Sequence, residues 1–300
     1  MKLTFGLRLA AHPLPVFLAV SLAGIIAFGE GTDFNQLQAK ASQGDAEGEF
    51  LLGRAYSRGE GVAQDDGKAF EWYRKAAEQG NAKAENNLGS AYLNGRGVGR
   101  DAAEGVKWYR KAAEQGAALA EDTLGELLAR GMGEKKDNKE AAEWYKKAAE
   151  QGLAQAQVHL GELYYFGAEG VPQNQGEAAK WIAKAAAQGN VWAENTMGVI
   201  RENGFGAEKD ATAAAEWYRK AAEQGDGKAQ SNLGLLYAEG SGVEQSWPEA
   251  YAWWSLSADG GEVTARKLLA SYQANLGADV VAEGKRLADG YREKIGKAKQ

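Results

Sequence analysis

Side chains that commonly perform chemistry are scarce in this sequence. The 300 residues include no cysteine and two histidines, His12 and His159. Without cysteine, the chain has no thiolate nucleophile, no thiolate metal ligand and no disulfide. No serine has a lysine at the third following position, which excludes the Ser-x-x-K arrangement of acyl-enzymes.

His159 lies on a predicted helix, directly before a Leu-Gly pair. The equivalent position in other parts of the chain holds Asn87, Thr123, Thr196 and Asn232. A position that accepts all these polar types indicates a polar contact between stacked helices, and not a general base.

Clustered carboxylates are the remaining candidates for catalysis. Glu121, Asp122 and Glu126 could form an acid–base pair, but most of the 41 acidic residues are expected on solvated helix surfaces. Gly-x-Gly recurs without the spacing of a dinucleotide fold or a phosphate-binding loop. The sequence therefore predicts no catalytic, cofactor-binding or metal site, and a protein that is not an enzyme.

The charge balance narrows the class of partner. Lys and Arg total 35 against 41 Asp and Glu, which gives a net charge of −6 and a pI of about 5.3. A nucleic-acid binder would show a basic excess or a basic stripe. We therefore expect a protein or peptide partner and no nucleic acid.

Residues 1–29 differ in composition from the rest of the chain. Lys2 and Arg8 are the only charges before Glu30, and an apolar run precedes two small residues, Ala27 and Gly29. This pattern predicts a signal peptide cleaved after Gly29, and a periplasmic or secreted protein. The alternative is an uncleaved anchor, but a run of about 15 residues is short of a membrane span.

A tryptophan recurs with a fixed period through most of the chain. The six copies are separated by 36 residues, except for one interval of 37, and are Trp72, Trp108, Trp144, Trp181, Trp217 and Trp253. Most of these tryptophans begin a segment close to WYRKAAEQG. Such a register indicates a repeat protein. The recurring tryptophans are expected in the core, whereas Trp247 and Trp254 fall outside the register and could cap the C-terminal end or meet a partner.

Each repeat divides into two predicted helices, A and B. Helix A of the second repeat covers residues 81–95, and its Leu88 is followed by Gly89. Glycine weakens a helix interior by about 1 kcal/mol, so its recurrence indicates that a neighbouring helix approaches the backbone there. Helix B begins after a capping residue seven positions before each tryptophan: Asp65, Asp101, Asp137, Asn174, Asp210 and Ser246.

These residues resemble the Sel-one-like repeat (SLR) family, a relative of the tetratricopeptide repeat. The resemblance rests on the pattern A-x-A-x-x-x-L-G-x-x-Y-x-x-G-x-G-V-x-x-D-x-x-x-A-x-x-W-Y-x-K-A-A-x-x-G. It implies an all-α, right-handed α-solenoid superhelix of about fifteen helices. We expect a signal peptide at 1–29, a half repeat at 30–42, six repeats at 43–259, and a half repeat with a capping helix at 260–300.

Solenoids of this kind bind along their concave face, which the resemblance assigns to the A helices. A helical wheel anchored on the Leu of each Leu-Gly pair predicts which residues face the groove. The candidates are Phe50, Leu93, Leu119, Asp122, Glu126, Val158, Glu162, Tyr165, Trp192, Val199, Glu202 and Leu235. Packing between neighbouring A helices would explain the apolar members equally well.

The mixture of apolar and acidic candidates predicts a partner with apolar anchors and some basic residues. The first functional hypothesis is therefore an exported interaction scaffold, for which the resemblance implies roles in envelope assembly, signalling or host contact. The alternative is binding or hydrolysis of peptidoglycan fragments or β-lactam-like ligands. That alternative requires a nucleophile or base, which the candidate residues do not supply.

Overall fold

The computed structural model describes residues 34–298, and within them fifteen α-helices follow one another. The A helices are α2 (Ala46–Arg58), α4 (Ala82–Asn94), α6 (Ala118–Arg130), α8 (Ala154–Phe166), α10 (Val191–Asn203) and α12 (Gly227–Glu239). The B helices are α3 (Asp66–Glu78), α5 (Ala102–Glu114), α7 (Asn138–Glu150), α9 (Gln175–Ala187), α11 (Ala211–Glu223) and α13 (Trp247–Asp259).

Single helices extend the array at both ends. These are α1 (Phe34–Ser42), α14 (Val263–Tyr272), a 3-10 turn at Gln273–Asn275, and the long helix α15 (Ala278–Ala298). The predicted all-α solenoid and its number of helices are confirmed. The predicted signal peptide lies outside the described residues.

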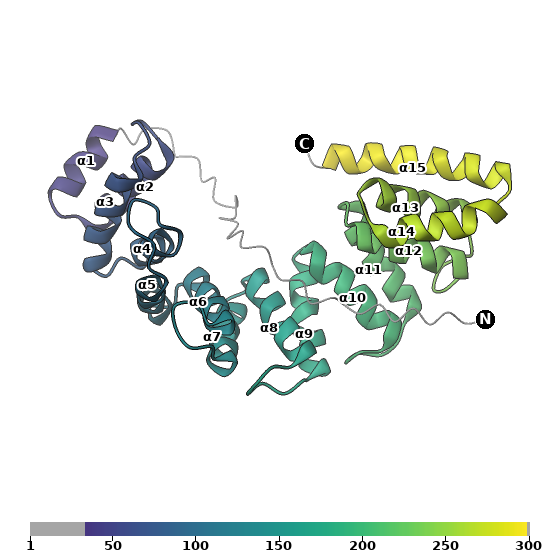
Figure 1. Ribbon diagram of the computed structural model, residues 1–300, viewed down its shortest axis with the longest axis horizontal. Coiled ribbons are helices and arrows are strands. Elements are labelled where there is room, and N and C mark those ends of the chain that lie inside the picture. Colours follow the sequence, from purple (N-terminus) through teal and green to yellow (C-terminus); the bar gives the residue numbers. More distant parts are fainter. Residues whose placement is uncertain (1–33, 299–300) are drawn as a thin grey trace.

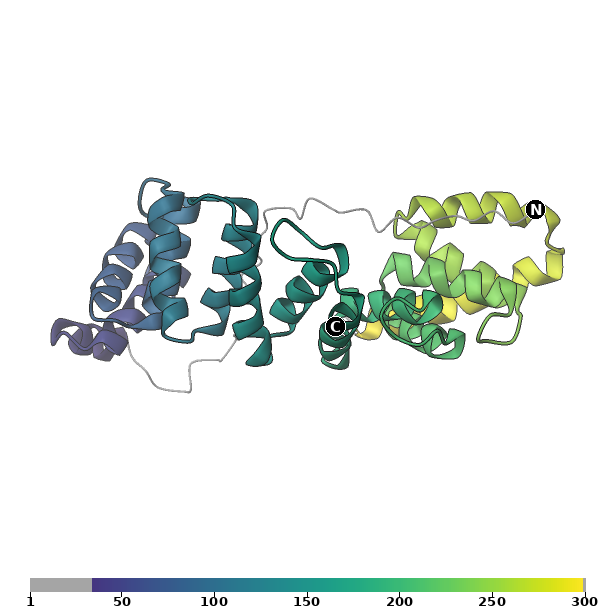
Figure 2. The same ribbon diagram turned by 90° about the horizontal axis from the view of Figure 1, so that it is seen from below.

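The helices stack along a curved path. Figure 1 shows an arc, with α6 and α8 on its inner side and α7 and α9 on its outer side. Figure 2 shows the helices of the first repeats standing side by side. Each B helix packs between the A helix before it and the A helix after it. The A helices of the middle repeats therefore line the inner face of the arc.

Local capping chemistry sets the helix boundaries. Each predicted capping residue before a B helix accepts a hydrogen bond from the backbone N–H three residues later. Five of the six A helices of the full repeats end at a glycine with a left-handed backbone, as at Gly95 with φ of 69°. Glycine adopts this conformation without steric strain, which explains the paired loop glycines.

The glycine of each Leu-Gly pair contacts a large side chain from the B helix of the same repeat. A Cβ atom added at Gly89 would lie 2.8 Å from Cδ2 of Tyr109 and 3.0 Å from the carbonyl oxygen of Gly105. The predicted steric reason for this glycine is confirmed. In the sixth repeat, Trp254 takes the place of the tyrosine over Gly234. Trp254 is fully buried, so the prediction that it could meet a partner is wrong.

The repeating tryptophans are less uniformly buried than predicted. Trp72, Trp108 and Trp217 are half-buried, whereas the other three are buried. In the first five repeats, a lysine three residues later places its Nζ atom 3.6–4.0 Å from the centre of the indole ring. A lysine over an indole face gains a cation–π attraction, and the ring is shielded without being enclosed.

The sixth tryptophan is covered differently because Leu256 stands where the lysine would be. Tyr291 of α15 stacks on Trp253 with ring centres 4.4 Å apart. The Tyr291 hydroxyl also donates to the Glu249 carboxylate at 2.9 Å. Trp253 is consequently fully buried, and α15 closes the C-terminal end of the stack.

A buried glutamate begins most A helices. Glu49, Glu85, Glu121 and Glu194 each accept a hydrogen bond of 2.7 Å from the glutamine that ends the following B helix. Burial raises the pKa of all four carboxyls, and the glutamine hydrogen bonds oppose this only in part. In the fourth repeat, Gln157 occupies the position and accepts from Gln188 at 2.9 Å.

The substitution Glu85→Gln is expected to stabilise the chain at neutral pH. A raised pKa in the folded state means that stability is greatest below the ordinary value of 4.5 and falls as the pH rises through the folded-state pKa. Removing the charge should therefore raise the free energy of unfolding at pH 7 by up to about 1 kcal/mol. The gain should vanish near pH 4, where the wild-type carboxyl is protonated.

Urea unfolding followed by circular dichroism at both pH values measures this effect. The matched control is Glu143→Gln on the exposed face of α7, which should leave the urea midpoint almost unchanged. A lower stability of the Glu85 variant at pH 7 would contradict the assigned cost of burying this charge.

Candidate functional site

Four of the predicted groove residues are buried, and of these only Leu93 lines the cavity described below. Phe50, Leu93, Asp122 and Val158 are each between 4% and 8% exposed. Phe50 packs with Tyr73, while Leu93 and Val158 join core clusters that extend into the next repeat. The placement of Phe50, Asp122 and Val158 in the groove is therefore wrong, because neighbouring repeats close over them.

Asp122 instead forms a polar contact between two A helices. Its Oδ1 atom lies 2.7 Å from Nδ1 of His159, which belongs to α8. Asn232 makes the equivalent contact with Asn195 at 3.3 Å, two repeats further on. The prediction that His159 is a polar rung between stacked helices is confirmed.

Two more carboxylates surround this rung. Burial alone would lower the pKa of His159, but the Asp122 hydrogen bond and the charges of Asp122, Glu126 and Glu162 outweigh it and raise the pKa. Burial raises the pKa of Glu162, and His159 acts in the opposite direction. The Tyr145 ring lies 5.0 Å from the His159 ring and covers it from α7. This cluster holds α6 and α8 together and leaves Glu126 and Glu162 partly exposed.

Glu202 and the apolar candidates of the later repeats lie only partly at the surface. The Tyr218 hydroxyl donates to Glu202 at 2.6 Å, which fixes the carboxylate on α10. Val199 and Leu235 are half-buried against neighbouring core clusters. These residues can contribute the edges of a contact surface but not its centre.

An aromatic cluster lies at the C-terminal ends of α8 and α10. The Tyr165 ring is 5.1 Å from the Phe166 ring and 6.2 Å from the Phe205 ring. Phe166 is 48% exposed. Tyr165 was predicted, whereas the two phenylalanines were missed. A comparison across repeats could have found Phe166, since the equivalent positions hold Arg58, Asn94, Arg130, Asn203 and Glu239.

Leu119 and Trp192 lie at the other ends of the A helices. Leu119 is in the first turn of α6 and is 59% exposed, and Trp192 is half-buried in the first turn of α10. The stacked A helices run in the same direction, so Tyr165 at the end of α8 and Trp192 at the start of α10 do not meet. The apolar candidates thus form two separate groups, one along each edge of the inner face.

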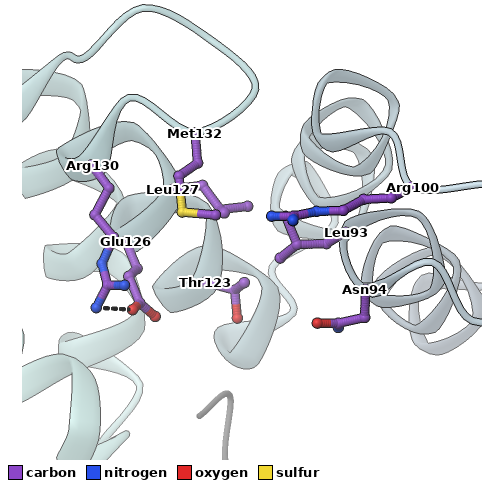
Figure 3. Close-up of a pocket in the computed structure, with 8 residues that line it drawn as sticks. All are labelled: Leu93, Asn94, Arg100, Thr123, Glu126, Leu127, Arg130 and Met132. Atoms are coloured by element: carbon purple, nitrogen blue, oxygen red, sulfur yellow. Dashed lines mark ion pairs between the residues drawn. The ribbon is translucent and has the colours of Figure 1, made fainter. Parts of the chain in front are cut away.

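A cavity of about 170 Å³ opens between the second and third repeats. Figure 3 shows Arg100 reaching across it from the loop after α4 toward Met132 and Leu127 on the opposite wall. The wall also carries an ion pair of 2.7 Å between Arg130 and Glu126. We call this cavity the junction pocket; its lining residues are Leu93, Asn94, Arg100, Thr123, Glu126, Leu127, Arg130 and Met132.

Six consecutive segments of the sequence match the pattern of the Sel1 repeat, at residues 46–81, 82–116, 119–153, 154–190, 193–226 and 227–262. The chain belongs to the Sel1 repeat family. Each matched segment contains one A helix and the B helix that follows it. Sel1 repeats build helical scaffolds that mediate interactions between proteins.

Solved structures support the same assignment. A Sel1 repeat protein from Oxalobacter formigenes is 35% identical over 75% of this chain and 89% of that protein, with a TM-score of 0.64. A protective antigen present in uropathogenic Escherichia coli strains, displaying an SLR fold, is 32% identical over 87% of this chain, with a TM-score of 0.58. This Sel1 repeat chain spans 64% of the antigen's length. No curated protein matches the sequence.

Within residues 34–298, no helix has the length and apolar character needed to cross a bilayer. In the same residues, no three His, Asp or Glu side chains gather closely enough to hold a metal ion.

Proposed function

We propose that the chain is an exported, non-enzymatic scaffold that binds a protein or peptide partner along the inner face of its A helices. One observation carries this proposal: large apolar side chains are exposed where most other repeats have polar ones. Leu119 has Glu47, Lys83, Gln155 and Lys228 at the equivalent positions, and Phe166 likewise replaces polar residues. Exposed apolar groups framed by polar residues are typical of protein-binding surfaces.

The charges on the same face indicate the character of the partner. Glu126 and Glu162 lie near the middle of α6 and α8, Glu202 lies in the last turn of α10, and all three are partly exposed; Glu126 also pairs with Arg130. A partner that places basic residues along the centre and apolar anchors at the edges would complement this pattern. An extended segment running across neighbouring A helices satisfies both requirements.

Export is supported by the residues before the helices. An apolar run that ends in small residues and follows Lys2 and Arg8 is the pattern of a secreted protein's leader. A relative described as a protective antigen agrees with a location outside the cytoplasm. A role in envelope assembly, signalling or host contact would follow from the identity of the partner.

Photo-cross-linking in cells tests the binding surface directly. A benzophenone amino acid would replace Phe166 or Leu119, with matched controls at Glu143 and Lys146 on the outer, exposed face of α7. We expect one protein to cross-link from the inner-face positions and not from the controls. Peptidoglycan fragments in place of a protein would favour the cell-wall alternative.

Alanine variants separate the two apolar groups. Tyr165→Ala with Phe166→Ala removes two rings of the aromatic cluster at the ends of α8 and α10. Trp192→Ala removes the aromatic ring of the other apolar group, in the first turns of α6 and α10. Each is expected to weaken capture of the cross-linked protein at least about tenfold while the helical content is retained. Equal cross-linking from all four positions, or capture unchanged in both variants, would contradict the proposal.

A further inference from the structure

Two side chains that line the junction pocket are smaller than their counterparts two repeats later. Leu93 and Met132 occupy the positions of Tyr165 and Phe205. The centres of those two rings are 6.2 Å apart across the boundary between the fourth and fifth repeats. The corresponding boundary between the second and third repeats holds the cavity of about 170 Å³. Aromatic side chains are thus accommodated at one boundary of this type.

The volume fits one side chain and not a larger ligand. An apolar cavity of roughly 150 Å³ is enough for a benzene ring, whereas sites for drug-sized molecules begin near 300 Å³. Leu93, Leu127 and Met132 supply apolar walls. One phenylalanine or leucine side chain therefore matches the available space.

Arg100 supplies a positive charge at the same place. In two other repeats the equivalent residue is held within the chain: Gln173 donates to the Tyr165 carbonyl at 2.7 Å and Gln245 to the Ala238 carbonyl at 2.8 Å. Arg100 has no ion pair in the described part of the chain, and it reaches into the pocket (Figure 3). The other guanidinium, of Arg130, is neutralised by Glu126.

We propose that the junction pocket binds the C-terminal residue of the partner, with an apolar side chain between Leu93 and Met132 and the terminal carboxylate paired with Arg100. The pocket has room for one residue, so that residue must supply both the apolar side chain that contacts the walls and the negative charge that pairs with Arg100. Only a chain end provides both, because an internal acidic side chain would need a second residue. This inference rests on the proposed function, since it names the part of the partner that is held.

A short peptide probe tests the proposal. The probe is acetyl-Gly-Ser-Gly-Ser followed by 4-fluorophenylalanine with a free carboxylate, and binding to the purified protein is followed by fluorine NMR. We expect the free acid to bind at least about tenfold more tightly than the same peptide with a C-terminal amide. A second amidated probe, with Glu before the fluorinated residue, should bind as weakly as the simple amide.

Three variants locate the binding. Leu93→Tyr with Met132→Phe reproduces the filled junction of the later repeats and should abolish binding without lowering the melting temperature. Arg100→Gln should bring the ratio of acid to amide affinity close to one. Lys136→Gln changes the equivalent position one repeat later, outside the pocket, and should leave both affinities unchanged.

Four results would overturn the proposal. These are no binding of the free acid at millimolar concentration, equal binding of acid and amide, equal binding of the internal-Glu probe, and binding that survives in the filled variant. Cross-linking from Phe166 and Leu119 does not depend on the partner's end. A protein captured there without any binding of the peptide acid would reject this inference and retain the proposed function.

Discussion

Replacing Gly89 by leucine is expected to lower the free energy of unfolding by about 3 kcal/mol. The Cβ atom alone would approach the Tyr109 ring to 2.8 Å, and the rest of the side chain would force α4 and α5 apart. Because α5 also packs against α6, the disturbance reaches the next repeat. Urea unfolding followed by circular dichroism should show the midpoint shift.

A matched control separates this contact from a general effect of replacing a helical glycine. Gly290 lies in α15, and an added Cβ atom there meets nothing within 4 Å. Gly290→Leu should be neutral or stabilising by up to about 1 kcal/mol, because leucine has the higher helix propensity. If the Gly89 variant unfolded at the wild-type midpoint, the close approach of the two helices would not be the reason for this glycine.

The substitution Trp253→Ala is expected to lower the free energy of unfolding by about 3–5 kcal/mol. Trp253 is fully buried, and the substitution removes the surface on which Tyr291 stacks. We therefore expect α15 to detach together with the loss of core packing. Hydrogen exchange should report faster exchange throughout α15 under native conditions.

The equivalent substitution in the first repeat is the control. Trp72 is half-buried, and Lys75 lies over its ring with Nζ 4.0 Å from the ring centre. Trp72→Ala should cost clearly less than Trp253→Ala, and exchange in α15 should stay at the wild-type rate. If both variants lowered the free energy of unfolding by the same amount, α15 would add nothing to the burial of Trp253.

The repeat architecture could be predicted because its determinants are local. Capping residues such as Asp101, loop glycines such as Gly95 and the period of the tryptophans each act within a few residues. Their agreement over six copies fixed the helices and their order. The contact between Gly89 and the following B helix was predicted for the same reason, since both belong to one repeat.

The binding face could be predicted only in part, because it depends on how the repeats are stacked. A helical wheel describes one isolated helix, so it placed Phe50 and Val158 at the surface although the next repeat covers them. It omitted Phe166, which follows Tyr165 in α8, and Phe205, which meets Tyr165 across the boundary between two repeats. The angle between repeats, which decides these contacts, has no local signature in the sequence.

The helix that covers Trp253 also decides where the array can change in length. An added repeat behind α13 would compete with α15 for the surface of α13. Trp253 would then lie next to the added repeat without the lysine that shields the earlier indole rings. Duplication of an internal unit meets no such obstacle, since each unit joins its neighbours through the same contacts. The contacts of α15 therefore favour a change in the number of repeats within the array over an addition behind α13.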